Sequence, residues 1–303
     1  MAAPVHASPL ERAWRVAYLV LCALVLIFLI APILIVVPLS FNAQPYFTFT
    51  PEMLRLDPTG FSGRWYDFLL TFGMQAPGAP RGLGWWRDAW ENAAWINAAK
   101  NSIIIGVLAT ILATALGTVA ALGLARPEMP GRRLIMAILI SPMIVPIIVT
   151  ATGLFLFYSR TGLAGSYAGI VLAHATLGVP FVIITVTATL ANFDTSLSRA
   201  AASLGAGPAL AFRRVTLSLI LPGVISGALF AFVASFDEVV VVLFVAGHEQ
   251  QTIPRQMWNG IREQISPAIL AVATILTVLS VGLLVTIELL RRRSERLRGA
   301  APS

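Results

Sequence analysis

The sequence is poor in charged residues and nearly free of lysine. Of its 303 residues, 12% are Asp, Glu, Lys or Arg, whereas soluble domains carry about 25%. Lys100 is the one lysine among 21 basic residues, and it lies in Ala-Ala-Lys-Asn. A Walker-type ATP-binding loop needs a lysine directly after glycine. The sequence therefore excludes that kind of ATPase, and its composition is unlike that of a protein dissolved in water.

Cysteine and the common catalytic motifs are equally scarce. Cys22 is the only cysteine, which excludes an intrachain disulfide and a CxxC metal site. His248 and Glu249 begin like a zinc-protease motif, but Thr252 replaces the second histidine, so the pair of metal ligands on one helix face is missing. No GxSxG nucleophile motif occurs. We therefore predict a protein that is not an enzyme and carries no metal or cofactor of its own.

Apolar residues, in contrast, are abundant and arranged in long runs. Hydrophobic residues make up 57% of the chain, and a helix needs about 20 mainly apolar residues to cross a membrane. Six stretches meet this requirement, which predicts an all-α integral membrane protein with six transmembrane helices. They are Val16–Leu39, Ser102–Ala125, Leu134–Tyr158, Ser166–Ala191, Leu217–Val245 and Ala268–Leu290.

The positions of the basic residues predict the orientation, because Lys and Arg concentrate in cytoplasmic loops. With a cytoplasmic N-terminus, thirteen arginines lie on the cytoplasmic side and three in the short loops opposite. We therefore expect both termini in the cytoplasm. The cytoplasmic set is Arg12, Arg15, Arg126, Arg132, Arg133, Arg199, Arg213, Arg214, Arg291, Arg292, Arg293, Arg296 and Arg298.

We expect three parts along the chain. Residues 1–95 hold a cytoplasmic tail, the first transmembrane helix and a long periplasmic loop. Residues 96–291 form a core of five further transmembrane helices, and residues 292–303 form a basic cytoplasmic tail. The long loop is rich in tryptophan, which favours the membrane interface over a ligand site. Its tryptophans are Trp65, Trp85, Trp86, Trp90 and Trp95.

The loop between the fourth and fifth apolar stretches, residues 192–216, predicts two short helices joined by a sharp turn. Asp194 or Thr195 is a good N-cap, Gly205 suits the left-handed position after a helix, and Pro208 suits the first turn of the next. Such a loop is a mere connector in many proteins. A transport protein without its own motor, however, needs a rigid element that receives force from a partner.

This loop resembles the EAA loop of bacterial ABC importer permeases, in which Glu-Ala-Ala is followed after three residues by Gly and later by Ile-x-Leu-Pro. Ala200, Ala201 and Gly205 keep the spacing, while Arg199 replaces the usual Glu and Ser218 the usual Pro. We refer to residues 192–216 as the EAA-like loop. The resemblance extends from about Trp95 to Arg291.

Further segments are similar to the second permease subunit of spermidine/putrescine importers, although an apparent insertion lies near Leu70–Trp90. These segments include Gly60-Phe-Ser-Gly-Arg-Trp-Tyr66, Asn101-Ser-Ile-Ile-Ile, Ser235-Phe-Asp-Glu238 and Pro254-Arg-Gln-Met-Trp-Asn-Gly.

The resemblance implies a type I ABC importer permease fold with a cytoplasmic coupling helix, in the bacterial inner membrane. It implies four kinds of partner: an ABC ATPase dimer that binds the ATP, a second homologous permease, a periplasmic substrate-binding protein and the lipid bilayer. No nucleic acid is expected, since the arginines mark the cytoplasmic face. The residues expected to contact the ATPase are Arg199, Ala200, Ala201, Gly205, Arg213 and Arg214.

Asp237 and Glu238 interrupt the fifth apolar stretch. Carboxylates inside a membrane are costly and usually face a cavity or a partner. They suit a path for polyamine cations, and they equally suit an ion pair or helix cap at a break near Asp237. Related permeases carry phosphonates, opines or iron, which stay open as alternatives. An ion-coupled secondary transporter would explain Asp237, Glu238 and His174, but it leaves the EAA-like loop unexplained.

Overall fold

The computed structural model describes residues 8–297 except 127, 192 and 264, and the described chain is helical apart from one isolated β-bridge between Asn42 and Phe61. Packing divides the chain into two units, Met1–Phe72 with Gly260–Ser303, and Gly73–Asn259. The expected division at residues 95 and 291 stays a prediction. The arginine side chains of the expected basic tail, 292–303, lie outside the described part.

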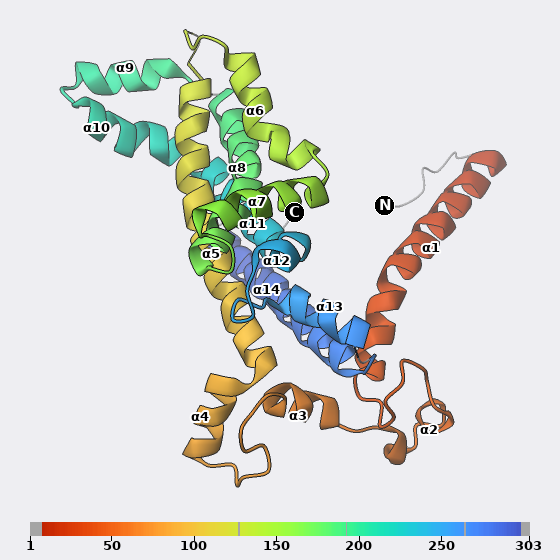
Figure 1. Ribbon diagram of the computed structural model, residues 1–303. Helices are drawn as coiled ribbons and strands as arrows, with labels where there is room; N and C mark the ends of the chain where they lie inside the picture. The colour runs from red at the N-terminus through yellow and green to blue at the C-terminus, as the bar shows by residue number, and fades with distance from the viewer. Residues whose placement is uncertain (1–7, 127, 192, 264, 298–303) are drawn as a thin grey trace. The chain divides into compact units, whose positions relative to one another are not determined.

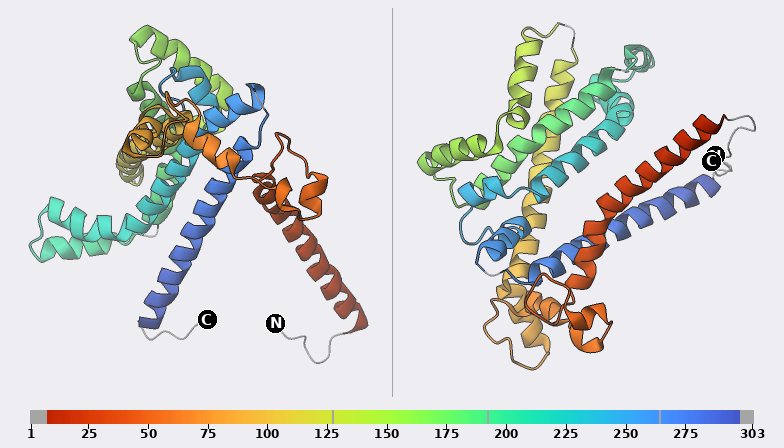
Figure 2. Two further views of the ribbon diagram at one scale, coloured as in Figure 1. Left: turned by 90° about the horizontal axis from the view of Figure 1, so that it is seen from below. Right: turned by 90° about the vertical axis from the view of Figure 1, so that its right-hand side faces the viewer.

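The first unit contains α1 (Pro9–Leu39), α2 (Pro51–Leu54), the 3-10 turn η1 (Pro58–Gly60), α3 (Arg64–Thr71) and α14 (Ala268–Leu297). Ser8 and Glu11 form a capping box at the start of α1, which satisfies amide groups that have no partner within the helix. The helices α1 and α14 contact each other and diverge toward their N- and C-terminal ends, respectively (Figure 2).

The loop after α1 folds around the buried side chain of Asn42. Its Nδ2 donates to the backbone carbonyl oxygens of Tyr46 and Thr48, and the backbone carbonyl of Asn42 accepts from Trp65 Nε1 at 2.8 Å. Buried polar groups need such partners. Trp65 is therefore part of the packing of this loop.

The second unit contains the remaining helices, and Figure 1 shows their arrangement. They are α4 (Leu83–Asn92), α5 (Ala94–Leu124), α6 (Arg132–Ile144), α7 (Ile147–Thr161), α8 (Tyr167–Ala191), α9 (Thr195–Ser203), α10 (Pro208–Ala211), the π-helical turn η2 (Phe212–Thr216), α11 (Leu217–Phe236), α12 (Val240–Val245) and α13 (Ile253–Glu263), of which the last four residues belong to the first unit.

Three helices, α5, α8 and α11, form the core of this unit. Small residues let them approach closely: a Cβ atom on Gly117 would lie 2.7 Å from Val182 Cβ, and one on Gly227 would lie 2.8 Å from Val182 Cα. This is the packing expected of membrane helices, where close contact between backbones replaces the hydrophobic drive of water. The buried residues of this core are Ala109, Ala113, Ala121, Ala175, Val182, Val186, Ile220 and Ala231.

The contacts fix the directions of these helices. Asn101, near the start of α5, accepts a hydrogen bond of 2.8 Å from the hydroxyl of Tyr167, the first residue of α8. Further along, Gly117 of α5 meets Val182 of α8, so α5 and α8 run parallel. Because α5 ends far from Tyr167, residues 125–166 must carry the chain back across the same thickness.

That return is made by α6 and α7, which are bent by 101° at Val145 and Pro146. The expectation of one continuous helix over Leu134–Tyr158 is therefore wrong. Pro146 lacks an amide hydrogen and disfavours helix in the residue before it. Each half has 13 or 15 residues, about 20 Å of helix, which is short of the roughly 30 Å hydrocarbon layer.

Within the described residues, five helices are long and apolar enough to cross a membrane, and the bent pair gives a sixth. The return of the chain between α5 and α8 supports the count of six. The all-α fold predicted from the sequence is confirmed. The helix that contains the second span, α5, begins at Ala94, eight residues before the predicted start of that span at Ser102.

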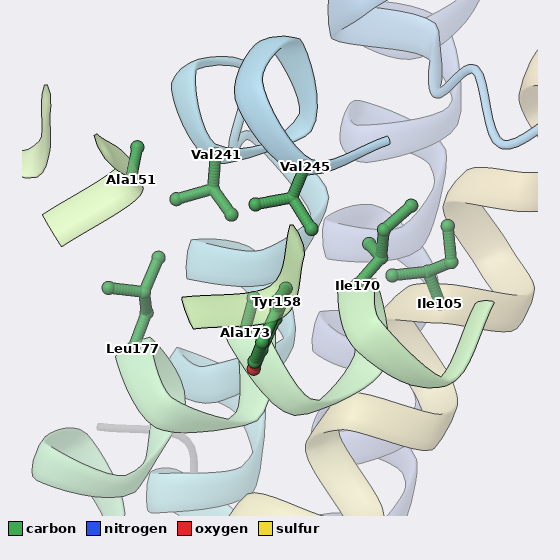
Figure 3. Packing of buried hydrophobic residues seen from close by; sticks show 8 residues of the cluster. All are labelled: Ile105, Ala151, Tyr158, Ile170, Ala173, Leu177, Val241 and Val245. Atoms are coloured by element: carbon green, nitrogen blue, oxygen red, sulfur yellow. The ribbon is translucent and has the colours of Figure 1, made fainter. Parts of the chain in front are cut away.

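A second buried cluster joins α7 and α12 to α8 (Figure 3). In this view Tyr158 lies near Ala173, and Val241 and Val245 lie above α8. All eight members are at least nine-tenths buried, so they anchor the two short helices that flank the long ones. The cluster is Ile105, Ala151, Tyr158, Ile170, Ala173, Leu177, Val241 and Val245.

Candidate functional site

The EAA-like loop joins the end of α8 to the start of α11, at the end of the core opposite α4 (Figure 1). It consists of α9 and α10 with a turn between them. The N-cap of α9 is Asp194, whose carboxylate accepts from the Ser196 amide at 2.8 Å and from its hydroxyl at 2.6 Å. These hydrogen bonds, the one from the hydroxyl first, lower the pKa of Asp194. The predicted cap is confirmed.

The turn after α9 has the predicted geometry as well. Gly205 has φ +85, a left-handed conformation that costs other residues energy. The Gly205 amide donates to the Ala202 carbonyl at 2.9 Å, and the Ala206 amide donates to the Ala201 carbonyl at 3.0 Å. This pair of bonds is a Schellman motif, which fixes the direction in which the chain leaves α9.

The second arm of the loop is continuous with the fifth span. Pro208 is the first residue of α10, as predicted, and α10 passes through η2 into α11 without a break. The η2 turn carries Arg213 and Arg214, both exposed. The turn at Gly205 is thus connected to a membrane helix through one π-helical turn, a feature frequent at functional sites.

The surface of the EAA-like loop is apolar at its tip and basic along its arms. Leu204, which lies in the predicted coupling element but was not singled out within it, is 89% exposed beside Gly205. Arg199 and Ala200 are also exposed, whereas Ala201 is half-buried. A groove of about 340 Å³ lies between the arms. It is lined by Ser198, Ala202, Ala206, Pro208, Ala211, Phe212 and Thr216.

Asp237 and Glu238 lie in the gap between α11 and α12, so the fifth span does break where the two carboxylates interrupt it. Glu238 is half-buried, and its Oε1 accepts from the Val241 amide at 2.9 Å. Asp237 is exposed, and among the described residues it makes no ion pair or side-chain hydrogen bond. Glu238 thus caps a helix, whereas Asp237 is available to another molecule.

The other end of α12 is held by Arg255, which the sequence reasoning did not single out. Its Nη1 donates to the carbonyl oxygens of Ala246 and Gly247 at 3.2 and 3.1 Å, and more distantly to Val242. A cation at the carbonyl end of a helix is favourable. The short helix beside Asp237 is therefore fixed at both ends by charged side chains.

Among the described residues, no group of three or more His, Cys, Asp and Glu side chains is placed to hold a metal ion. His174 is buried inside the core, and its Nδ1 pairs with the hydroxyl of Ser235, two residues before Asp237. The structure thus offers two separate features for function: the EAA-like loop at one end of the core, and the gap at Asp237.

The part of the chain that contains both features matches one known family. Residues 113–296 match the family described as binding-protein-dependent transport system inner membrane component. The chain is 32% identical over 267 residues to the spermidine/putrescine transport system permease protein PotC of Haemophilus influenzae, covering 88% of this chain and 93% of that protein. It is 30% identical to the putrescine transport system permease protein PotI of Escherichia coli strain K12, covering 97% and 96%.

The fold also has a counterpart among solved structures. A chain from the crystal structure of a bacterial ABC transporter involved in the import of the acidic polysaccharide alginate superimposes with a TM-score of 0.65 at 17% identity, covering 94% of this chain and 98% of that one. The predicted ABC importer permease fold is thereby confirmed.

Proposed function

Because the chain belongs to the binding-protein-dependent transport system inner membrane components, we propose that it forms half of the membrane pathway of an importer for polyamines such as spermidine and putrescine. The general role follows from the family: the protein is a multi-pass inner-membrane permease of an ABC importer and not an enzyme. ATP in such systems is hydrolysed by a partner ATPase, and a binding protein is the other implied partner.

The polyamine assignment is carried by the likeness to PotC and PotI, which extends over nearly the whole length of each protein. The fold alone does not determine the substrate, because the structurally similar alginate transporter imports a polyanion. Charge supports the assignment, since the described spans expose the carboxylate of Asp237 at a helix break. Polyamines are multiply charged cations, and a carboxylate at membrane depth attracts cations.

The depth of Asp237 follows from the helix contacts. Ser235 pairs with His174, which lies seven residues into α8 from Tyr167, or about 10 Å along the helix. Asp237 is two residues beyond Ser235, so it lies within the span and not at its end. Arg255 binds backbone carbonyls nearby and so leaves Asp237 uncompensated. These relationships support a role in the substrate path.

For the EAA-like loop we propose docking to the ATPase dimer through Arg199, Ala200, Ala201, Gly205, Arg213 and Arg214, together with Leu204. The groove between the two arms supports this role, because its lining is mostly apolar and it opens beside the exposed Leu204. The capped helix α9 and the Schellman turn make the loop stiff enough to transmit force. The exposed arginines favour an acidic docking surface on the partner.

A second permease, homologous to this chain, completes the pathway in this proposal, and both termini lie in the cytoplasm. The parallel course of α5 and α8 supports the orientation. On this course Arg126, Arg132 and Arg133 lie at the same end of the core as the EAA-like loop, which carries three further arginines, as expected of a cytoplasmic face. An ion-coupled secondary transporter no longer fits, because this family works with a partner ATPase.

Uptake by cells that lack their own copy of this permease tests the substrate assignment. Restoring the intact chain with its partner subunits should restore uptake of labelled putrescine or spermidine. Asp237→Asn should reduce that uptake while the complex still assembles, whereas Ser218→Ala, an exposed change on α11, should not. Undiminished uptake by Asp237→Asn would remove this residue from the path. Failure of the intact chain to import either polyamine would contradict the assignment itself.

A further inference from the structure

The helix α4 has three distinct faces. Trp85 and Ala89 are buried, and Trp85 Nε1 donates to the Pro77 carbonyl at 3.2 Å. Arg87 and Glu91 pair with each other at 2.8 Å on an exposed face. The third face is apolar and uncovered: Leu83, Trp86 and Trp90 are 92%, 52% and 60% exposed. A helix periodicity of 3.6 residues separates these sets cleanly.

A contact with α5 fixes where the apolar face lies. The Lys100 ammonium lies 4.7 Å from the centroid of the Trp90 ring and also donates to the Trp90 carbonyl. Lys100 precedes the apolar run that begins at Ser102 by only two residues, or about 3 Å of helix. The Trp90 ring is therefore level with the boundary between the hydrocarbon layer and the headgroups.

Lys100 also connects α4 to the exposed side of α5. Lys100 is on one helical stripe of α5 with five exposed apolar residues, spaced three and four apart. At this depth only lipid or another membrane helix can cover them. The apolar face of α4 continues this stripe across Trp90. The stripe consists of Ile103, Ile104, Val107, Leu108 and Ile111.

We propose that α4 lies in the headgroup layer of the bilayer, with Leu83, Trp86 and Trp90 against lipid and Arg87 and Glu91 toward water. Tryptophan prefers this layer because its ring is apolar and its ring nitrogen donates hydrogen bonds. The side of α4 that carries Asp88, next to the buried face, ties the anchor to the protein: Asp88 accepts hydrogen bonds from the amides of Gln75 and Ala76. The segment thus fixes the depth at which α5 enters the membrane.

Site-specific labelling of the full-length chain in vesicles of phosphatidylethanolamine and phosphatidylglycerol tests this. In a Cys22→Ser background, a single cysteine replaces Leu83, Trp86 or Trp90, and in matched controls Arg87 or Glu91 of the same helix. Each is labelled with an environment-sensitive fluorophore. Labels on the apolar face should be quenched several-fold more by nitroxide-bearing lipids than labels on the charged face, and less by a water-soluble quencher.

Leu83→Cys keeps both tryptophans, so it remains informative if the tryptophan variants do not fold. Equal access of the water-soluble quencher to all labelled positions would overturn the proposal. So would protection of the apolar face that appears only when the binding protein is added, because the face would then be a protein interface. These results do not depend on the transported substrate, so they can fail while the polyamine assignment holds, and the reverse.

Discussion

The Nδ1 atom of His174 lies 2.8 Å from the Oγ atom of Ser235, which joins α8 to the last turn of α11. His174 is 1% exposed, and its Nε2 is buried without a hydrogen-bond partner among the described residues. A histidine enclosed in this way has no route to water or substrate in the second unit. Its position supports a structural role for this residue and a separate role for the neighbouring Asp237.

Ser235→Ala should destabilise the helix core. The change leaves both ring nitrogens of His174 buried without partners, and one unsatisfied buried group costs about 1–3 kcal/mol. We expect a lower midpoint of thermal unfolding in detergent, with ATPase binding retained below that temperature. Ser218→Ala, on the exposed side of the same helix, is the control. An unchanged midpoint for Ser235→Ala would show that the pair contributes nothing to stability.

Gly205 and Gly207 form a matched pair for testing the EAA-like loop. A Cβ atom would meet nothing within 4 Å at either position, but only Gly205 has a left-handed backbone. Gly205→Ala should therefore cost about 1–2 kcal/mol and weaken coupling to the ATPase, whereas Gly207→Ala should not. Transport per ATP hydrolysed in vesicles measures this. The bulkier and charged Gly205→Asp should uncouple hydrolysis from transport, and normal uptake by it would contradict docking at the turn.

The charged side chains at the two ends of α12, Arg255 and Glu238, can be tested separately. Arg255→Leu should lose the hydrogen bonds to the Ala246 and Gly247 carbonyls and cost about 1.5–3 kcal/mol, seen as loss of assembled complex. Arg262→Leu, exposed on the same helix, is the control. Glu238→Gln keeps an oxygen that accepts from the Val241 amide, so assembly should persist. If Glu238→Ala assembles as well as Glu238→Gln, the cap is not needed.

The stability of the stretch from Gln75 to Asn92 should depend on pH, because Asp88 titrates. Hydrogen bonds, first the one from the Ala76 amide, lower the pKa of this carboxyl below its ordinary value of 3.8. Its contribution is therefore present above pH about 4 and is lost as the pH falls through the lowered value. Proteolysis in this stretch by an acid-active protease should rise at low pH, and Asp88→Asn should raise it at neutral pH. Glu91→Gln, in an exposed pair of little energetic worth, should not.

Much of the fold could be predicted from the sequence because membrane helices need long apolar runs. The cap and turn residues of the EAA-like loop could also be predicted, because each depends only on its neighbours in sequence. Asp194, Gly205 and Pro208 each satisfy a requirement of their own turn. The bend at Pro146 was missed because the apolar run continues through it. Hydropathy detects the length of such a run but not its direction.

Contacts between residues far apart in the chain could not be predicted from the sequence. Arg255 caps α12 from a distance of about ten residues, and nothing in its neighbours marks it. Asp237 and Glu238 look equivalent in sequence, yet one is exposed and the other binds the Val241 amide. The five tryptophans also differ, since Trp65, Trp85 and Trp95 are buried while Trp86 and Trp90 are exposed. Only packing distinguishes them.

The most direct test of the central claim is ATP hydrolysis by the purified complex of this permease, its partner permease, the ATPase and the binding protein. Putrescine or spermidine should stimulate hydrolysis only when the binding protein is present, and Gly205→Asp should break the link between hydrolysis and uptake. Stimulation by a phosphonate, an opine or iron, with no response to either polyamine, would contradict the account.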